Sequence, residues 1–414
     1  MPRIPRNPNA SPPAAMFDPE SIVVGLEIGT CKVCAAVGEV SPQGAFTVLG
    51  LGQARSRGVR KGEIMDPHKT GEDIRQAIAE AEQMADVEVR SVFLGVTGAH
   101  IRGFNNRGIH PVVSADRQIT ADDVEDAIRN AKAVNLPADH SVIHTVRQDF
   151  AVDDMEGVEN PVGLVGARVE ARVHVVHGHG NRMQNGIRAV QGLQIEVEQV
   201  VFNGLASALA VLGKDQKELG ALVVDLGAGA TTYALYSGSI LRHSGVLGVG
   251  GDHVSNDLAL GLNLPLGRAE QLKLEHGGAL VDEGCRGATV TLGSEPGLPE
   301  RTVNLAHLRR IQSLRLEETL ELVARDIGPL LSHARAGVFL TGGGARTRDL
   351  VPLAERVFHL PVDIARTQDV SGPMASLDQP EFSAAIGLAR FGAMRQRRPP
   401  PGGWRNLLGG WLRR

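Results

Sequence analysis

The chain has 414 residues, a net charge of −4, 42% hydrophobic residues and 22% charged residues, a composition ordinary for a globular protein of roughly two to four domains. Three cysteines are too few for a disulfide framework, and the absence of any run of about 18 apolar residues excludes a membrane-spanning helix. Seven arginines and no acid lie in residues 390–414, so residues 1–389 carry a net charge of −11, which argues against nucleic acid as a main partner.

The first predicted element follows a proline-rich leader. Residues 1–20 contain six prolines and no apolar run, so we expect a disordered leader and not a secretory signal. Residues 22–26 form an apolar run of the buried-strand type, and a second apolar run covers 33–37. The two runs predict a tight hairpin. Its turn carries an acid, a glycine and a hydroxyl residue: Glu27, Gly29 and Thr30.

Two amphipathic helices are predicted next. Residues 70–85 fit a helix with Thr70 as its N-cap, and residues 121–134 fit a helix capped by Thr120. Acids occupy the first turn of the second helix, where the helix dipole is positive. The strands predicted in this part are 91–96 and several within 141–176, including a period-two pattern at Val169, Ala171, Val173 and Val175.

The hairpin pattern then returns. Residues 221–236 again read as strand, acid, glycine-rich turn and strand, with Asp225 in the place of Glu27 and with Gly227 and Gly229 in the turn. Two copies of one pattern, each followed by helices and further strands, are typical of a duplicated α/β domain rather than of a short-period repeat.

A third glycine-rich turn lies further along the chain. It follows an apolar strand at 337–341 and leads into a predicted helix at 348–357, and a long helix is predicted before it, at 316–331. The glycines of this turn are Gly342, Gly343 and Gly344. Beyond Phe391 the composition becomes rich in arginine, proline and glycine, which is typical of a linker.

Glycine-rich turns at strand ends suit phosphate binding. Glycine lets backbone N–H groups approach phosphate oxygens closely, and a helix that starts after the turn adds its positive end. A single glycine-rich turn more often has only a structural role. Three such turns, distributed over the two halves of one chain, predict a nucleotide cleft between two lobes. The acids Glu27 and Asp225 would hold hydrated Mg²⁺. Neither a P-loop nor a dinucleotide-binding glycine motif occurs in the sequence.

Two sets of metal-type side chains carry weaker signals. Cys31 and Cys34 form a CxxC pair, but an offset of three on a strand points them to opposite faces, and no second pair completes a zinc site. His174, His177 and His179 cluster at a strand end with no carboxylate at ligand spacing. Ordinary structural roles are the expectation for both sets.

The segments around these turns resemble the FtsA family of bacterial cell-division actins, within the actin/Hsp70-like ATPase superfamily. The similar segments are 24–33, 56–58, 61–62, 160–168, 204–207, 269–273 and 340–344. The resemblance covers roughly residues 21–414. It implies an α/β protein with a duplicated actin-like (RNase H-like) ATPase fold in two lobes around a nucleotide cleft, an inserted 1C-type subdomain and a C-terminal amphipathic helix.

The resemblance also implies a subdomain division. The expected ranges are 1–20 for the leader; 21–96, 173–205 and 376–392 for subdomain 1A; 97–172 for 1C; 206–245 and 333–375 for 2A; 246–332 for 2B; 393–403 for a linker; and 404–414 for the terminal helix. The position of the inserted subdomain and the tethered tail separate FtsA from other bacterial actins.

Carried over residue by residue, the resemblance implies ATP and Mg²⁺ as ligands. The expected contacts are Gly29, Thr30 and Lys32 with the phosphates from one lobe, Asp225, Gly227 and Gly229 from the other, Glu270 and Lys273 with the nucleoside, and Gly342, Gly343 and Gly344 over the adenine. Glu270 and Lys273 share a helix face at i, i+3; without the resemblance they would be an ordinary surface ion pair worth under about 1 kcal/mol.

The second phosphate motif departs from the family pattern. Ala230 stands where the pattern has a hydroxyl residue, and Thr232 stands where it has an acid, although Thr231 lies beside them. Backbone donors remain for binding, but fewer side chains can position a water molecule for attack. We therefore expect at most a weak ATPase.

The end of the chain predicts a membrane-binding helix. The two tryptophans of the chain and three leucines fall at i, i+3, i+4, i+7 and i+8, one apolar helix stripe: Trp404, Leu407, Leu408, Trp411 and Leu412. Arg405 and Arg413 flank the stripe and suit anionic headgroups. Eleven residues would span only about 16 Å, so the helix would lie on the membrane. The Pro- and Gly-rich spacer 399–403 argues against the alternative, a helix docked on the body.

The resemblance implies partners as well. Arg315 and Glu318 open the predicted long helix and match family positions that bind the C-terminal peptide of FtsZ; a solvated helix face is the alternative. Self-association into filaments, contacts of later divisome proteins with the 1C region, and a location on the cytoplasmic face of the cell membrane at the division site are also implied. The rival hypotheses are another bacterial actin (pilus-assembly or shape-determining type), an Hsp70-type chaperone, which would need a further peptide-binding domain, and a sugar or acetate kinase, for which the sequence offers no convincing catalytic base.

Overall fold

The computed structural model describes residues 21–294, 300–372 and 377–396. The leader expected at 1–20 and the terminal helix expected at 404–414 lie outside the described residues, as do residues 397–403 of the expected linker. Within the described ranges, no helix combines the length and the hydropathy that a bilayer span requires.

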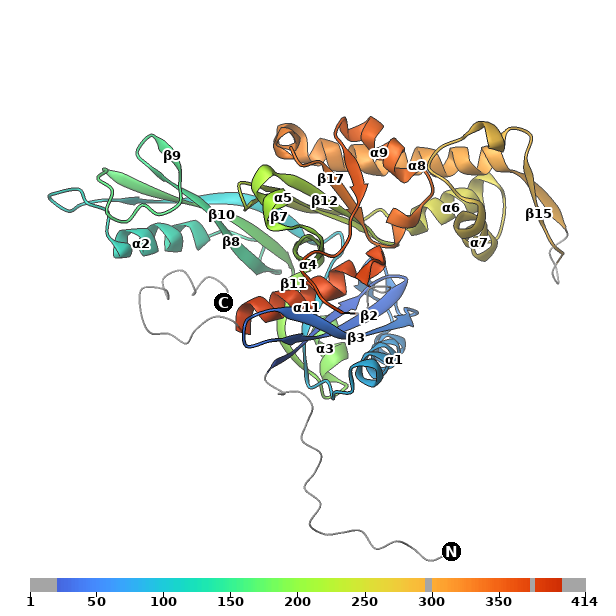
Figure 1. The fold of residues 1–414 in the computed structure, drawn as a ribbon, viewed down its shortest axis with the longest axis horizontal. Helices are drawn as coiled ribbons and strands as arrows, with labels where there is room; N and C mark the ends of the chain where they lie inside the picture. The colour runs from blue at the N-terminus through green and yellow to red at the C-terminus, as the bar shows by residue number, and fades with distance from the viewer. Residues whose placement is uncertain (1–20, 295–299, 373–376, 397–414) are drawn as a thin grey trace, which may run out of the picture.

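Two sheets form the centres of two lobes (Figure 1). Each sheet has five strands, and the strands of the two sheets follow the same order. In each sheet an antiparallel three-strand meander is joined through its first strand to two parallel strands. The first sheet contains β1 (Ile22–Ile28), β2 (Lys32–Val40), β3 (Phe46–Arg55), β6 (Ser91–Val96) and β11 (Glu196–Phe202). The second contains β12 (Ala221–Leu226), β13 (Thr231–Ser237), β14 (Ile240–Leu247), β17 (Val338–Thr341) and β18 (Val362–Ile364). The predicted duplication is confirmed.

The helix α1 (Pro67–Ala85) begins earlier than expected. Its N-cap is Asp66, whose side chain accepts a hydrogen bond from the Lys69 amide, and Pro67 occupies the first helical position. Thr70 is fully buried inside the helix and donates its hydroxyl proton to the Asp66 carbonyl, so the prediction of Thr70 as N-cap is wrong. Asp followed by Pro is the stronger start signal, because Pro needs no N–H partner at the first helical position.

The helix α2 (Ala121–Lys132) begins where the sequence predicted. Thr120 and Asp123 form a reciprocal capping box, in which each side chain bonds the backbone N–H of the other residue. Such a box satisfies two amides that the helix itself leaves unpaired. The predicted cap at Thr120 is therefore confirmed.

The long helix α8 (Leu305–Ile327) starts well before the predicted position of 316. Asn304 caps it by accepting a hydrogen bond from the His307 amide, and Gly328, at φ 57°, ends it. The range 316–331 therefore misses the first half of the helix, and residues 328–333 form a separate 3-10 turn. The next helix, α9 (Leu350–Phe358), agrees with the prediction within two residues at each end.

A separate sheet projects from the first lobe between β6 and α3 (Gly180–Gln191). Its strand order is β7 (Arg102–Pro111), β10 (Arg168–His179), β8 (His140–Val152) and β9 (Met155–Val158), with α2 packed on one face (Figure 1). The period-two residues Val169, Ala171, Val173 and Val175 are all fully buried. Because β10 stays paired with β7 and β8 past residue 173, the boundary expected between 172 and 173 falls inside one continuous strand.

The second lobe carries its own addition between β14 and β17. It consists of α6 (Gly251–Gly261), α7 (Leu266–His276), the hairpin β15 (Thr289–Leu292) and β16 (Arg301–Asn304), and α8. The remaining short elements are β4 (Val59–Arg60), β5 (Glu63–Ile64), α5 (Lys214–Leu219) and four 3-10 turns at 283–285, 328–333, 343–346 and 380–382. The two lobes thus share a core and differ in what is inserted and where.

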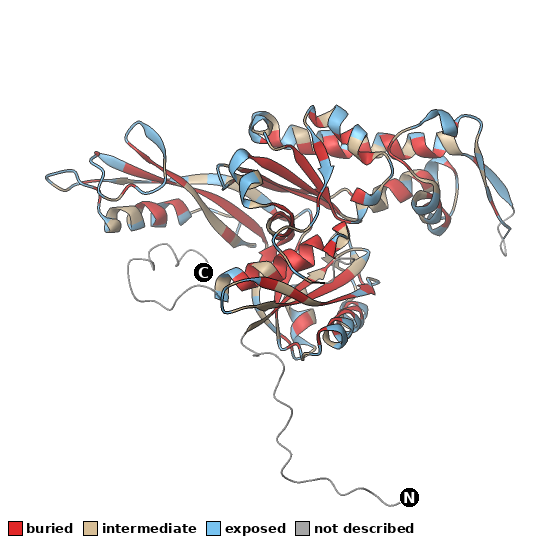
Figure 2. Ribbon diagram, viewed as in Figure 1, coloured by how far each residue is buried: buried red, intermediate tan, exposed pale blue. Residues whose placement is uncertain are grey.

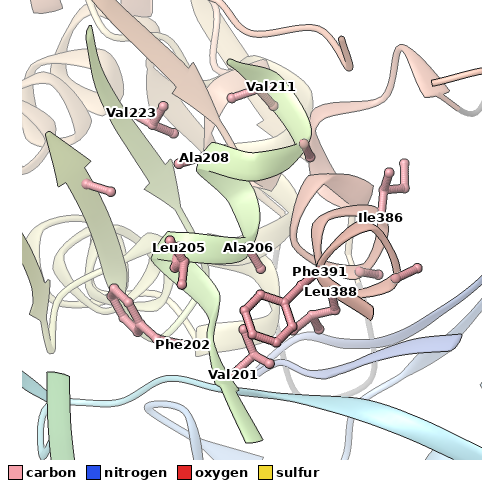
Figure 3. Packing of buried hydrophobic residues seen from close by; sticks show 14 of the residues in the cluster. Val201, Phe202, Leu205, Ala206, Ala208, Val211, Val223, Ile386, Leu388 and Phe391 are labelled. Carbon is pink, nitrogen blue, oxygen red and sulfur yellow. The ribbon is translucent and has the colours of Figure 1, made fainter. Parts of the chain in front are cut away.

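Two helices, α4 (Asn203–Val211) and α11 (Ser383–Gln396), join the lobes. They pack against each other in a cluster of buried apolar residues that includes Phe202, Leu205, Leu388 and Phe391 (Figure 3). Buried residues concentrate in the central sheets and in α11 (Figure 2). Since α11 continues to Gln396, residues 393–396 are helical and do not belong to the linker expected from 393.

Glycine permits this packing. A Cβ on Gly387 of α11 would lie 1.8 Å from the Ala206 carbonyl oxygen of α4, and a Cβ on Gly25 of β1 would lie 2.2 Å from the Ala385 carbonyl oxygen of α11. No side chain fits at either point, because the obstacle is backbone. Fifty glycines among 414 residues exceed the typical share of about 7%, and part of the excess serves this close contact between layers.

We predict that Gly387→Ala lowers the free energy of unfolding by about 2 kcal/mol, because the added methyl group forces α4 and α11 apart. Gly71→Ala in α1 is the matched control, since nothing lies within 4 Å of the point that its Cβ would occupy, and it should raise the stability by up to about 1 kcal/mol. Urea denaturation followed by circular dichroism measures both. Equal stabilities of the two variants would contradict this account of the packing.

Candidate functional site

A cavity of about 620 Å³ lies between the two lobes, a size typical of small-molecule sites. All residues that the sequence predicted to contact nucleotide or Mg²⁺ line it: Glu27, Gly29, Thr30, Lys32, Asp225, Gly227, Gly229, Glu270, Lys273, Gly342, Gly343 and Gly344. They come from β1, β2, β12, α7 and the turns that follow the strands. The fold therefore brings together residues that are far apart in the sequence.

The two hairpin turns have the same backbone geometry. The Gly29 amide donates to the Lys32 carbonyl oxygen at 2.9 Å, and the Gly227 amide donates to the Ala230 carbonyl oxygen at 3.0 Å. A Cβ on either glycine would stand 2.7 Å from the carbonyl oxygen that its own amide bonds. Both turns therefore require glycine for the same steric reason.

The second turn packs directly against the first lobe. A Cβ on Gly229 would lie 2.3 Å from Thr30 Oγ1 and 2.7 Å from the Cα of Lys61. Thr30 Oγ1 in turn accepts a hydrogen bond of 2.8 Å from the Gly62 amide. Lys61 and Gly62 both adopt positive φ, at 51° and 77°. The two turns therefore meet where Gly229 packs against Thr30, and the 61–62 loop lies beside this contact.

A cluster of largely buried charged side chains lines the cavity. Lys32 Nζ lies 3.7 Å from Glu27 Oε2, and it also donates to the Glu381 carbonyl oxygen. Asp225 Oδ2 accepts a hydrogen bond of 2.6 Å from Ser207 Oγ. Burial raises the pKa of Glu27 and that of Asp225, and the positive charge of Lys32 only partly opposes the increase. Glu27 and Asp225 thus have only Lys32 as a nearby cation, and their negative charges destabilise the folded state.

Three buried oxygen atoms around this cluster have no hydrogen-bond partner: Glu27 Oε2, Asn203 Oδ1 and Thr232 Oγ1. All three residues line the cavity. Buried polar atoms are normally satisfied, and carboxylate, amide and hydroxyl oxygens are the donor set that holds Mg²⁺ and its water ligands. The residues present therefore fit a hydrated divalent cation between Glu27 and Asp225.

Glu270 and Lys273 lie in the cavity wall and not on the outer surface. Lys273 Nζ lies 2.6 Å from Glu270 Oε2 and donates to Ser255 Oγ at 2.9 Å and to the Gly251 carbonyl oxygen at 3.2 Å. Only 14% of the Lys273 side chain is exposed. The pair thus joins α7 to the start of α6, and through Gly251 it connects to the second glycine turn.

Arg315 and Glu318 lie elsewhere, on the middle of α8 and not at its start. Arg315 binds Asp257 of α6 through two nitrogens, at 2.5 and 3.2 Å, and also contacts Glu318. About a quarter of the Arg315 side chain is exposed. This cluster does not line the cavity. The predicted membrane-binding residues from Trp404 to Arg413 lie outside the described residues.

Sequence reasoning missed several residues of these sites. The sequence placed Thr232 in the second phosphate motif but assigned it no contact; it is the cross-strand neighbour of Asp225, a relation that the hairpin register could have revealed. Asn203 and Ser207 follow β11 on α4. Asn203 lines the cavity, and the buried Ser207 belongs to the site through its hydrogen bond to Asp225. Asp257 meets Arg315 from another helix, and nothing in its local sequence signals that contact.

The histidine and cysteine sets have structural partners. His174 is fully buried and hydrogen-bonds Asn105 and Ser244, each at 2.7 Å, and His177 Nδ1 lies 2.8 Å from His140 Nδ1. In the part of the chain that the structure describes, no three His, Cys, Asp or Glu side chains are grouped so that they could hold a metal ion directly. Cys34 is buried in β2, whereas Cys31 is exposed in the turn before that strand, so the two cysteines do not share a strand as the sequence predicted.

Comparison with known proteins gives two family matches. A model described as cell division protein FtsA matches residues 222–387, and a model described as the SHS2 domain inserted in FtsA matches residues 98–177. The cell division protein FtsA of Escherichia coli (strain K12) is 37% identical over 412 residues, covering 95% of this chain and 98% of that protein. That of Pseudomonas aeruginosa is 38% identical over 377 residues, covering 91% and 90%.

Solved structures share the fold at low identity. The PilM–PilN type IV pilus biogenesis complex matches with a TM-score of 0.63 at 18% identity, covering 92% of this chain and 100% of that chain. MreB5 of Spiroplasma citri, bound to ADP, matches with a TM-score of 0.54 at 15% identity, covering 92% and 98%. These similarities support the actin-like fold.

We predict that Asp225→Asn raises the thermal midpoint of the protein at pH 7, without nucleotide or divalent ion, by a few degrees. The raised pKa means that the buried charge costs stability at every pH above the folded-state pKa. The gain should shrink as the pH falls through that pKa, because the native carboxyl is then neutral too.

Differential scanning fluorimetry between pH 4 and pH 8 measures the effect. Glu196→Gln, an exposed carboxylate on β11, is the control and should change little. A lower midpoint for Asp225→Asn at pH 7 would show that the charge stabilises the fold, contrary to this prediction.

Proposed function

The chain belongs to the FtsA family of cell-division proteins, and we propose that it acts as an ATP-dependent tether that holds the FtsZ ring to the cytoplasmic membrane. The observation that carries the proposal is the cavity between the lobes, where two glycine turns with the same internal hydrogen bond meet and each lobe contributes one largely buried carboxylate. Such a site suits an anionic ligand that binds together with a cation.

The ligand we propose is ATP with Mg²⁺. Backbone amides of the turns at Gly29–Lys32 and Gly227–Ala230 would receive the phosphates, and Lys32 would add a positive charge. Glu27 and Asp225 would hold the metal through its water molecules, and the metal would neutralise phosphate charge when bound. Glu270 and Lys273 would meet the ribose, with Gly342–Gly344 beside the base. MreB5, which shares the fold, binds ADP in one structure and AMPPNP in another.

Hydrolysis is expected to be slow. The second turn lacks the hydroxyl and acid side chains that the family pattern places at positions 230 and 232, where this chain has Ala230 and Thr232. Thr232 Oγ1 is buried and is not a base. Fewer groups are thus available to orient an attacking water molecule. Bound ATP would mainly hold the two lobes together. A turnover number for ATP hydrolysis above a few per second would contradict that role.

The membrane contact is assigned to residues 404–414. Their apolar stripe and flanking arginines suit an interfacial helix on an anionic surface, where each nearby arginine contributes about 1 kcal/mol. The remaining body is acidic, with a net charge of −11 on residues 1–389, and is repelled by that surface. The basic tail would therefore set both the attachment and the orientation of the protein at the division site.

The partner contact is assigned to the Arg315–Glu318–Asp257 cluster. It combines a partly exposed guanidinium with two carboxylates on α6 and α8, and it would bind the C-terminal peptide of FtsZ. Head-to-tail self-association and recruitment of later divisome proteins through the inserted sheet complete the proposed role. The PilM–PilN match does not favour a pilus role, because 18% identity supports only the fold.

Co-sedimentation of the full chain with anionic vesicles tests the proposal. We predict that the protein pellets with phosphatidylglycerol-containing vesicles and carries a labelled FtsZ C-terminal peptide with it in the presence of Mg-ATP. A chain that ends at residue 403 should lose vesicle binding, because it lacks the apolar stripe. Arg315→Ala should still pellet but should carry at least about fivefold less peptide, since one charge-assisted contact contributes roughly 1–3 kcal/mol.

The matched control for Arg315→Ala is Arg325→Ala on the same helix. Arg325 is exposed and lies nearly three helical turns away, so peptide binding should be unchanged. Pelleting of the shortened chain, or equal peptide binding by Arg315→Ala and the native protein, would contradict the proposed tether.

A further inference from the structure

One wall of the cavity comes from a single face of α8. Arg309, Gln312, Leu316 and Thr319 all line the cavity, at the i, i+3, i+7 and i+10 spacing of one helix stripe. The first two are almost completely buried, at 4% and 2% exposed. The family resemblance assigned no function to these two polar residues.

A series of contacts connects the α8 face of the cavity to the second glycine turn. The Gly251 amide donates to the Gly227 carbonyl oxygen at 3.0 Å, and the Gly251 carbonyl oxygen accepts from Lys273 Nζ at 3.2 Å. Gly277 lies one helical turn beyond Lys273 at the end of α7, and Gln312 packs against it. A ligand with phosphates at Gly227 and a sugar beside Lys273 would therefore place its next group, the base, against Gln312.

The end of α7 fits closely onto α8. A Cβ on Gly277 would lie 2.3 Å from Gln312 Oε1, and a Cβ on Gly278 would lie 3.1 Å from Arg309 Nε. Arg309 also donates to the His276 carbonyl oxygen at 3.3 Å and to Asp282 Oδ2 at 2.9 Å. The position of Gln312 is therefore fixed by packing and by its neighbour's hydrogen bonds.

The Gln312 amide has an unfilled hydrogen-bond requirement. Its Oε1 atom is buried and has no partner. The Lys273 carbonyl oxygen lies on the same side of Gly277, 2.2 Å from the position of its Cβ, and accepts a hydrogen bond of 3.1 Å from the Gly277 amide, so the nearest backbone group to Gln312 Oε1 is an acceptor and not a donor. Rotation of the amide by 180° turns its NH₂ group toward the Lys273 carbonyl and its oxygen toward the cavity. That oxygen then needs a donor from the ligand.

We propose that Gln312 accepts a hydrogen bond from the exocyclic amino group of adenine and so makes the cleft select adenine over guanine nucleotides. This inference rests on the proposed function, because it requires a nucleoside triphosphate in the cavity. Adenine presents an amino donor at its C6 position, whereas guanine presents a carbonyl oxygen there. In this orientation the NH₂ group of Gln312 faces the Lys273 carbonyl oxygen and would lose that acceptor if the amide turned to donate to guanine, so the guanine oxygen would meet the Gln312 oxygen.

Equilibrium binding to the full-length protein tests the role of Gln312. Dissociation constants are measured by calorimetry in Mg²⁺ for ATP, GTP and purine riboside triphosphate, which lacks the amino group of adenine. The native protein should bind ATP at least about tenfold more tightly than either analogue, because a buried acceptor without its donor is costly. Gln312→Leu should weaken ATP binding alone and bring ATP and purine riboside triphosphate to equal affinity.

Two controls separate specificity from damage to the fold. An affinity of Gln312→Leu for purine riboside triphosphate at least as high as that of the native protein shows that the cavity is intact, and Glu321→Gln, exposed on the same helix, should keep the native ratio. Equal native affinities for ATP and purine riboside triphosphate, or an unchanged ratio in Gln312→Leu, would overturn the inference alone. Absence of any nucleotide binding by the native protein would overturn the proposed function and this inference with it.

Discussion

The arrangement of the molecule depends on two buried carboxylates, one from each lobe, that meet beside one lysine. Glu27 and Asp225 occupy matching positions in duplicated hairpins, and burial raises the pKa of both. A fold that only had to be stable would gain little from such a pair, because unpaired buried charge is costly. The cost is understandable if a cation and a phosphate chain complete the cluster, since the ligand then supplies the charges that the protein lacks.

Close backbone packing keeps the two halves of this cluster in position. Gly387 places α11 against α4, and Gly25 places β1 against α11, so the first hairpin and the lobe-crossing helices form one rigid unit. The second hairpin reaches the same unit through Asp225, which Ser207 of α4 holds. Ser207 therefore couples Asp225 to the helices that also pack against the first hairpin, and so fixes Asp225 relative to Glu27.

Local signals predicted much of this structure, and long-range contacts account for what was missed. The two hairpins, the glycine turns and the cap at Thr120 each depend on a few residues that are adjacent in the sequence, so they could be predicted. Thr70 resembled an N-cap because it immediately precedes the apolar pattern of the helix. The helix begins earlier, at Asp66 and Pro67, in a turn that carries no apolar pattern of its own. Asn203, Asp257 and Gln312 carry no local motif; their positions in the sites come from the crossing of helices that are distant in the sequence.

In the proposed complex, one ligand contacts both lobes at the same time. Hydrogen–deuterium exchange of the full-length protein, with and without Mg-ATP, tests it most directly because it reports on each turn separately. We expect slower exchange in both hairpin turns, around residues 29–32 and 227–230, and at the junction of α7 and α8 near residue 277. Protection confined to one lobe, or no change at saturating nucleotide, would contradict the account.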